Sequence, residues 1–115
     1  MPTPATAYVH TENQLETLFR LRVRTVLGGR VEKFRAARSG VPDRVVILPL
    51  NRLYVVELKT ETGSLEPLQV EWHRTALKLA PRCVFTLYGL RDIDNWVRDR
   101  AQEYDTLMDI VYGKD

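Results

Sequence analysis

The 115-residue chain contains a single cysteine, Cys83, so it cannot form an intrachain disulfide. No apolar stretch approaches the roughly 18–20 residues of a membrane span, and no signal-peptide pattern opens the chain. These absences favour a protein of a reducing cytoplasm, in which Cys83 is an inert thiol in a buried strand. A chain of this length is expected to form one domain, residues 1–115, whose core needs no disulfide.

The sequence also lacks internal repeats and a glycine-rich phosphate-binding loop. Its net charge is only +2, but the charge is unevenly distributed. Between Arg20 and Arg44 there are eight Lys/Arg and two acidic residues, a local charge of +6, which leaves −4 for the rest of the chain. A concentrated basic segment on a nearly neutral protein favours a polyanionic partner, although a solvated basic face would give the same pattern.

Two segments near the N-terminus have distinct patterns. Residues 1–8 include two prolines and are expected to form a loose arm. A Thr-x-x-Gln capping box at Thr11–Gln14 predicts the start of a helix, which Gly28-Gly29 ends. Apolar residues recur there with helical spacing and are expected to face the core: Leu15, Leu18, Phe19, Val23, Val26 and Leu27.

The middle of the chain predicts strands at 31–34, 45–48 and 53–59, with a loop at 35–42 and a turn at 49–52. Because residues 45–48 are all apolar, that strand is expected to be buried on both faces. A second helix begins near Pro67 and ends before Pro81. Its apolar stripe is expected to comprise Leu68, Trp72, Ala76 and Leu79.

A strand at 84–87 and a helix from about Asp92 complete the chain. The resulting order, αβββαβα, predicts a three-layer α/β fold with a central mixed sheet. Trp72 and Trp96 are expected to anchor the core, and His10 to belong to the N-terminal arm. His73 shares a helix face with Gln69, but is expected to face solvent or to cap the helix.

The candidate catalytic residues are three charged residues near two strand ends: Asp43, Glu57 and Lys59. If Pro49 pairs with Leu53 across the turn, Asp43 lies opposite Lys59 and Glu57 is its diagonal neighbour. All three side chains then project from one face of the sheet, because strand side chains alternate. A slip of one residue would move Asp43 to the other face.

Charged groups on a central strand are costly unless they are paired or bind a metal. Asp43 and Glu57 would offer hard oxygen ligands to Mg²⁺ or Mn²⁺, and the backbone carbonyl of Leu58 could add another. Lys59 would orient the attacking water or neutralise the phosphorane of a hydrolysed phosphodiester. A Glu-x-Lys triplet alone, however, indicates no more than an ion pair at a sheet edge.

The ordered series around these residues is more specific than the triplet. The series begins with Gly-Val-Pro-Asp (40–43), which is followed by a strand, a turn and a strand ending in Glu-Leu-Lys (57–59). Leu-Gln (68–69) then opens a helix. This series resembles the PD-(D/E)xK nuclease superfamily and, within it, the VRR-NUC family (virus-type replication-repair nucleases). The resemblance covers about residues 12–87 and implies a restriction-endonuclease-like fold and metal-dependent cleavage of DNA.

The resemblance also implies roles for individual residues. Asp43 and Glu57 correspond to the metal ligands of the family and Lys59 to its catalytic lysine. Gln69 corresponds to the glutamine that supports the site from the second helix. Glu12 lies where the family has a glutamate near the metal, with Glu16, one turn further on, as the competing candidate.

Contacts with the DNA backbone are expected from the basic segment. Lys33 corresponds to a basic residue that often precedes the Gly-x-Pro-Asp loop in the family. The other candidates flank or lie within that loop: Arg35, Arg38 and Arg44.

Stand-alone proteins of this family resemble Holliday-junction resolvases that act as homodimers. The resemblance therefore implies a structure-selective endonuclease of recombination, repair or replication. A flap or single-strand nuclease of the same fold and a non-cutting DNA-binding module are the alternatives. The apolar segment 107–112 would serve as a dimer contact or dock on the chain's own core.

Overall fold

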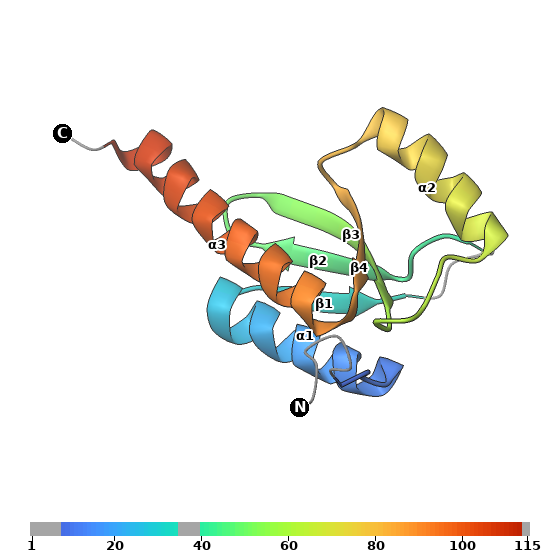
Figure 1. Ribbon diagram of the computed structural model, residues 1–115. Coiled ribbons are helices and arrows are strands. Elements are labelled where there is room, and N and C mark those ends of the chain that lie inside the picture. The colour runs from blue at the N-terminus through green and yellow to red at the C-terminus, as the bar shows by residue number, and fades with distance from the viewer. Residues whose placement is uncertain (1–7, 35–39, 114–115) are drawn as a thin grey trace, which may run out of the picture.

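The computed structural model describes residues 8–34 and 40–113 (Figure 1). The elements follow the order expected from the sequence: α1 (Glu12–Leu27), β1 (Arg30–Lys33), β2 (Arg44–Leu48), β3 (Arg52–Lys59), α2 (Pro67–Leu79), β4 (Val84–Tyr88) and α3 (Gly89–Tyr112). The strands form one sheet in the order β1-β2-β3-β4, in which only the β3–β4 pair is parallel. The expected α/β class with a mixed sheet is therefore confirmed.

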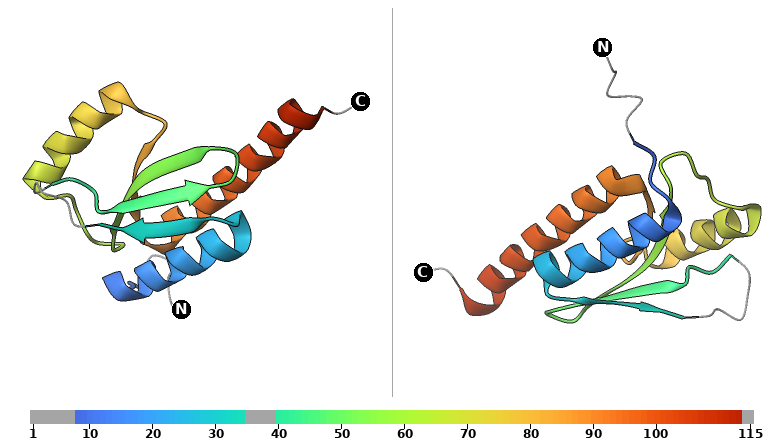
Figure 2. Two further views of the ribbon diagram at one scale, coloured as in Figure 1. Left: turned by 180° about the vertical axis from the view of Figure 1, so that it is seen from behind. Right: turned by 90° about the horizontal axis from the view of Figure 1, so that it is seen from below.

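The helices are distributed unevenly about the sheet. α1 and α3 pack side by side against one face, and α2 lies to one side, in contact with β4 (Figures 1 and 2). The opposite face of the central hairpin stays open, so Ile47 and Leu53 are 43% and 54% exposed. The expectation that residues 45–48 are buried on both faces was wrong, because α1 and α3 cover only one of them.

The core lies between the sheet and the α1–α3 pair. From α1 the core includes one residue per turn: Leu15, Phe19, Val23 and Leu27. Leu18 is half-buried and Val26 is 57% exposed, so the expected apolar face was too wide. Trp96 of α3 is buried against Phe19 and Tyr54, as an anchor of the core should be.

The boundaries of α1 agree with the sequence signals. Thr11 and Gln14 form the capping box, and Gly28 ends the helix in the left-handed conformation with φ of 63°. Pro67 starts α2, as expected.

The apolar stripe assigned to α2 was largely wrong. Leu68 and Leu79 are 55% and 82% exposed, Trp72 is half-buried, and His73 is the residue that α2 buries. The reason is that α2 does not lie across the sheet. Cys83 is also exposed, because it occupies the turn before β4 rather than the strand itself.

The β2–β3 hairpin has a different register from the expected one. Leu48 pairs with Arg52 and Arg44 with Val56, so the loop comprises three residues, Pro49 to Asn51. The expected pairing of Pro49 with Leu53 was wrong by two residues. A shift of two keeps every side chain on its face. Asp43 therefore still shares a face with Glu57, and by continuation of the ladder it lies opposite that residue.

Arg52 ties the hairpin to α3. Its buried guanidinium donates hydrogen bonds to the carbonyls of Pro49 and Arg100 and to the carboxylate of Glu103, at 2.8–2.9 Å. Glu103 also accepts a hydrogen bond from the Tyr54 hydroxyl. Burial, together with this bond, raises the pKa of Tyr54 to about 12. These contacts fix the turn end of the hairpin and thereby hold its open end, where Asp43 and Glu57 lie.

None of the helices within residues 8–34 and 40–113 is long and apolar enough to cross a membrane.

Candidate active site

A cavity of about 140 Å³ opens at the end of the hairpin opposite its turn. Residues from α1, β1, the start of β2 and the end of β3 line it: Glu12, Leu15, Lys33, Asp43, Arg44, Glu57, Leu58 and Lys59. The structure thus brings together most of the residues that the sequence singled out, from segments up to 47 positions apart (12 to 59).

The loop that carries Asp43 is held by close packing. Gly40 has a φ of +89°, and a Cβ built on it would lie 2.5 Å from the carbonyl oxygen of Leu68 in the first turn of α2. Only glycine fits this conformation and this approach without strain. Pro42 is fully buried. The Gly-Val-Pro-Asp sequence therefore packs against α2 at Gly40 and leads into β2 with Asp43 at the cavity.

Glu57 is the most perturbed acid of the cavity. Its side chain is buried, with 8% of the residue exposed. Burial raises the pKa of Glu57, and the neighbouring carboxylates of Asp43 and Glu12 raise it further, whereas Lys59 and Arg44 oppose the shift. A buried carboxylate next to other carboxylates is costly to ionise. It is therefore suited to bind a cation.

Arg44 connects Asp43 to α1. Its Nη1 lies 2.9 Å from Oδ1 of Asp43, and its Nε and Nη2 lie 2.8 and 2.7 Å from Oε1 of Glu16. The Arg44 side chain is only 10% exposed. The guanidinium of Arg44, which was expected to contact DNA, is turned inward here, and its charge is matched by two carboxylates.

The two candidate carboxylates of α1 have different surroundings. Glu12 lines the cavity and influences Glu57 electrostatically. Glu16 lies among three cations, Arg44 at 2.7 Å, Arg20 at 3.2 Å and Lys33 at 4.0 Å. Burial opposes ionisation of Glu16, but these cations outweigh it and lower its pKa. Of the two, the geometry therefore leaves Glu12 free to act as a ligand in the cavity.

α2 approaches the site through His73 rather than Gln69. His73 is 5% exposed, and its buried Nε2 has no hydrogen-bond partner among residues 8–34 and 40–113. Burial and the positive charge of Lys59 lower the pKa of His73, so the ring is neutral at pH 7. The expectation of a solvent-facing or capping histidine was wrong. The apolar pattern of α2 gave no signal for this burial, which depends on how the helix docks.

Gln69 has a different contact from the expected one. Its side-chain oxygen accepts a hydrogen bond of 2.8 Å from the backbone N–H of Glu66, which completes a capping box at the start of α2. It is not among the residues that line the cavity.

The basic residues of the segment differ in their availability. Lys33 lines the cavity, and its side chain is 53% exposed, so it is accessible to a polyanion. Arg35 and Arg38 lie outside the described residues. Of the two candidates for DNA contacts that lie among the described residues, Lys33 has the more exposed side chain, 53% against 10% for Arg44.

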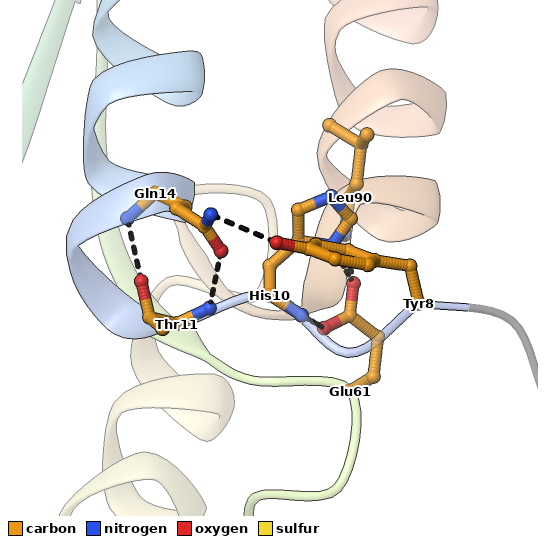
Figure 3. A network of polar contacts seen from close by, with 6 residues as sticks. All are labelled: Tyr8, His10, Thr11, Gln14, Glu61 and Leu90. Atoms are coloured by element: carbon orange, nitrogen blue, oxygen red, sulfur yellow. Dashed lines mark hydrogen bonds and ion pairs between the residues drawn. The ribbon is translucent and has the colours of Figure 1, made fainter.

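The segment before α1 is anchored near α3, as Figure 3 shows. The carboxylate of Glu61 accepts hydrogen bonds from the backbone N–H groups of His10 and Leu90, at 2.8 and 3.0 Å, and contacts the His10 ring at 2.7 Å. Burial opposes ionisation, but these bonds outweigh it and lower the pKa of Glu61 to about 2. His10 was therefore wrongly assigned to a loose arm.

The donor set of the cavity fits a hard divalent cation. Asp43 and Glu57 can offer carboxylate oxygens, and Leu58, which follows Glu57, also lines the cavity. Within the described ranges, no cluster of three or more His, Cys, Asp or Glu side chains has the geometry to hold a metal by itself. Mg²⁺ does not need such a cluster, because it is usually bound through one or two carboxylates, waters and substrate phosphates.

The comparisons with known proteins agree with this geometry. A family model described as the VRR-NUC domain matches residues 2–79. A solved structure described as a VRR_NUC domain is 29% identical, with a TM-score of 0.66 over 76% of this chain and 94% of that one. No curated protein matches the chain.

The fold and the site therefore define a nuclease of the PD-(D/E)xK type, whose partner is DNA. The chain belongs to the VRR-NUC family.

Proposed function

We propose that this protein is an endonuclease that hydrolyses phosphodiester bonds of DNA with the help of Mg²⁺ or Mn²⁺. The observation that carries the proposal is the position of Glu57. It is buried, its pKa is raised, and it shares a cavity with Asp43 and Lys59. Such an arrangement costs stability without a cation and is common where carboxylates serve a reaction.

In this mechanism Asp43 and Glu57 would hold the cation, and the carbonyl of Leu58 and Glu12 would be further candidates to hold it. The bound ion would polarise the phosphate and lower the pKa of a water. Lys59 donates hydrogen bonds to the attacking water or to the phosphate oxygens, where negative charge develops in the transition state. Gln69 would support the site indirectly, by capping the start of α2, whose first turn packs against the loop that carries Asp43. Lys33, Arg35 and Arg38 would contact neighbouring phosphates.

We propose branched DNA, and in particular a four-way junction, as the substrate. The VRR-NUC match covers residues 2–79, and this domain would recognise branched DNA through the shape and charge of the DNA backbone. Flaps or single strands are the alternative substrates. A DNA-binding module that does not cut is less well supported, because Asp43, Glu57 and Lys59 all line the cavity.

A homodimer would suit this substrate, because two symmetric cuts need two sites at a fixed separation. The end of α3 projects beyond the sheet (Figure 1). Its last apolar residues, Ile110, Val111 and Tyr112, are 73%, 60% and 73% exposed. Apolar surface of this kind is costly in water, and a second copy could bury it.

The test is a cleavage assay that compares four-way junction, flap, duplex and single-stranded DNA, with Mg²⁺, with Mn²⁺ and with EDTA. We expect paired cuts in the junction that EDTA abolishes and that Lys59→Met reduces without loss of DNA binding. Exposed Lys78→Met is the matched control. Cleavage that is unaffected by EDTA, or by Lys59→Met, would refute the mechanism.

Light scattering at micromolar concentration tests the assembly. A mass of twice 13.3 kDa is expected, and Val111→Glu should shift it toward the monomer. A wild-type monomer that persists with junction DNA would favour the flap or single-strand substrates instead.

A further inference from the structure

Arg44 follows Asp43 in the chain, and its expected role in DNA binding does not explain its position. Arg44 lies at the first position of β2, opposite Val56, and its side chain is turned toward α1. It contacts Asp43 on one edge of the guanidinium and Glu16 on the other. Burial of an arginine is costly unless its charge is matched. Here two carboxylates match it, and one of them is a residue of the cavity.

We propose that Arg44 and Glu16 form a clasp that fixes the carboxylate of Asp43 in the orientation needed to bind the cation. In this clasp both are positioning residues. The inference rests on the proposed function, since it assumes that Asp43 is a metal ligand.

The geometry explains why the clasp acts on orientation. Arg44 Nη1 lies 2.9 Å from Oδ1 of Asp43, so this contact engages one oxygen of the carboxylate. The Asp43 side chain is 38% exposed, and it follows a loop rather than lying within a strand. Without a partner its carboxylate could adopt several rotamers. A carboxylate that is held by a hydrogen bond loses less conformational entropy when it binds a ligand.

Glu16 in turn fixes Arg44. The carboxylate is anchored on α1, whose neighbouring residue Leu15 is fully buried. Oε1 of Glu16 receives both Nε and Nη2 of Arg44, at 2.8 and 2.7 Å. The planar guanidinium therefore has both of its edges occupied. A lysine at position 44 would keep the charge but could not reproduce this fork.

The charges of the clasp also matter for the choice of variant. Removal of Arg44 would have two opposite effects on cation binding. Loss of a positive charge beside the cation would strengthen binding, whereas release of the Asp43 carboxylate would weaken it. Lys at position 44 separates the two effects, because only the geometry changes. The pair Glu16→Gln and Arg44→Met also keeps the local net charge, since one charge of each sign is removed.

The experiment is a titration with Mn²⁺ followed by electron paramagnetic resonance of the free ion, without DNA, on full-length protein. Partners that orient metal ligands typically contribute 10–100-fold to affinity. We expect Arg44→Lys to weaken Mn²⁺ binding by about tenfold or more. The rate of cleavage should recover at high Mn²⁺ concentration in this variant, but not in Asp43→Asn.

The matched control is Arg20→Lys, which keeps the charge as Arg44→Lys does. Arg20 also lies near Glu16, at 3.2 Å, but its side chain is 42% exposed and it does not line the cavity. This variant should leave Mn²⁺ affinity unchanged. If Arg44→Lys does not fold, the Glu16→Gln/Arg44→Met pair decides, because replacement of both partners of a buried ion pair is often tolerated.

The outcomes separate the clasp from the proposed function. A folded Arg44→Lys protein that binds Mn²⁺ with wild-type affinity would overturn the clasp and leave metal dependence intact. If only the double variant folds, wild-type Mn²⁺ affinity in that protein has the same meaning. Failure of the wild-type protein to bind Mn²⁺, with or without DNA, would overturn both. Equal weakening in Arg20→Lys would also overturn the clasp, since it would indicate a general effect of altering any arginine beside Glu16.

Discussion

Gly40 lies so close to Leu68 that a Cβ at position 40 would approach the Leu68 carbonyl oxygen to 2.5 Å. This contact joins the loop before β2 to the first turn of α2. Asp43 is three residues further along the same loop, so the close approach helps to set the position of a proposed metal ligand.

We expect Gly40→Ala to destabilise the protein by about 2 kcal/mol or more, because it combines a strained positive φ with a backbone clash. Gly28→Ala is the matched control, since Gly28 also has a positive φ but nothing within 4 Å of the added Cβ. It should cost about 1 kcal/mol. Urea denaturation measures both. Equal losses would show that the approach to Leu68 is not tight.

Glu57→Gln should abolish cleavage and yet stabilise the fold in metal-free buffer at pH 7.5. Burial raises the pKa of Glu57, so its charged form costs folding free energy at every pH above that pKa. The stability gain should therefore disappear as the pH falls below about 4, where the wild-type carboxyl is protonated in both states. Cleavage should fall on the order of 10³-fold. A variant that is less stable than wild type at pH 7.5 contradicts this prediction.

Glu61→Gln should destabilise the protein by about 1 kcal/mol at neutral pH, because it weakens charge-assisted hydrogen bonds at a partly exposed site. The pKa of Glu61 is lowered to about 2. Its contribution is thus present above the unfolded pKa, near 4.5, and is lost as the pH falls toward 2. Denaturation between pH 7 and pH 2 should show the two curves converging. Exposed Glu71→Gln serves as the control, and a constant difference would refute the assignment.

Lys33→Gln should weaken DNA binding for all sequences and reduce the slope of log affinity against log salt by about one unit. The reason is that Lys33 is exposed at the rim of the cavity and would release one counterion equivalent on binding phosphate. Lys78→Gln, near the end of α2, controls for loss of a positive charge elsewhere. An unchanged slope for Lys33→Gln would assign Lys33 to a solvated face.

The ring of His73 should titrate below its ordinary pKa of 6.5, as followed by NMR of the imidazole protons. Burial and the charge of Lys59 both favour the neutral ring. Lys59→Met should therefore raise the pKa of His73, whereas Lys78→Met should not. Because the folded-state pKa is depressed, His73 should reduce stability progressively as the pH falls below 6.5. Titration at or above 6.5 in the wild type would contradict the buried position.

Local sequence signals determined the elements of this protein. The capping box at Thr11, Pro67 at the start of α2 and Gly28 at the end of α1 act within one helical turn, so their effect does not depend on the rest of the fold. The alternation of strand side chains has the same local character. It placed Asp43 and Glu57 on one face although the register was wrong by two residues, because a shift of two preserves the face.

The tertiary structure decided which charged and apolar groups are buried. α2 docks beside β4 rather than across the sheet, so Ile47 and Leu79 are exposed while His73 is buried. Arg44 pairs with Glu16, 28 residues away, and no local pattern specifies that contact. Sequence periodicity reports only which side chains share a face. The partner that a face receives depends on the packing of distant segments, and here that packing turned a candidate DNA-binding arginine into the neighbour of Asp43.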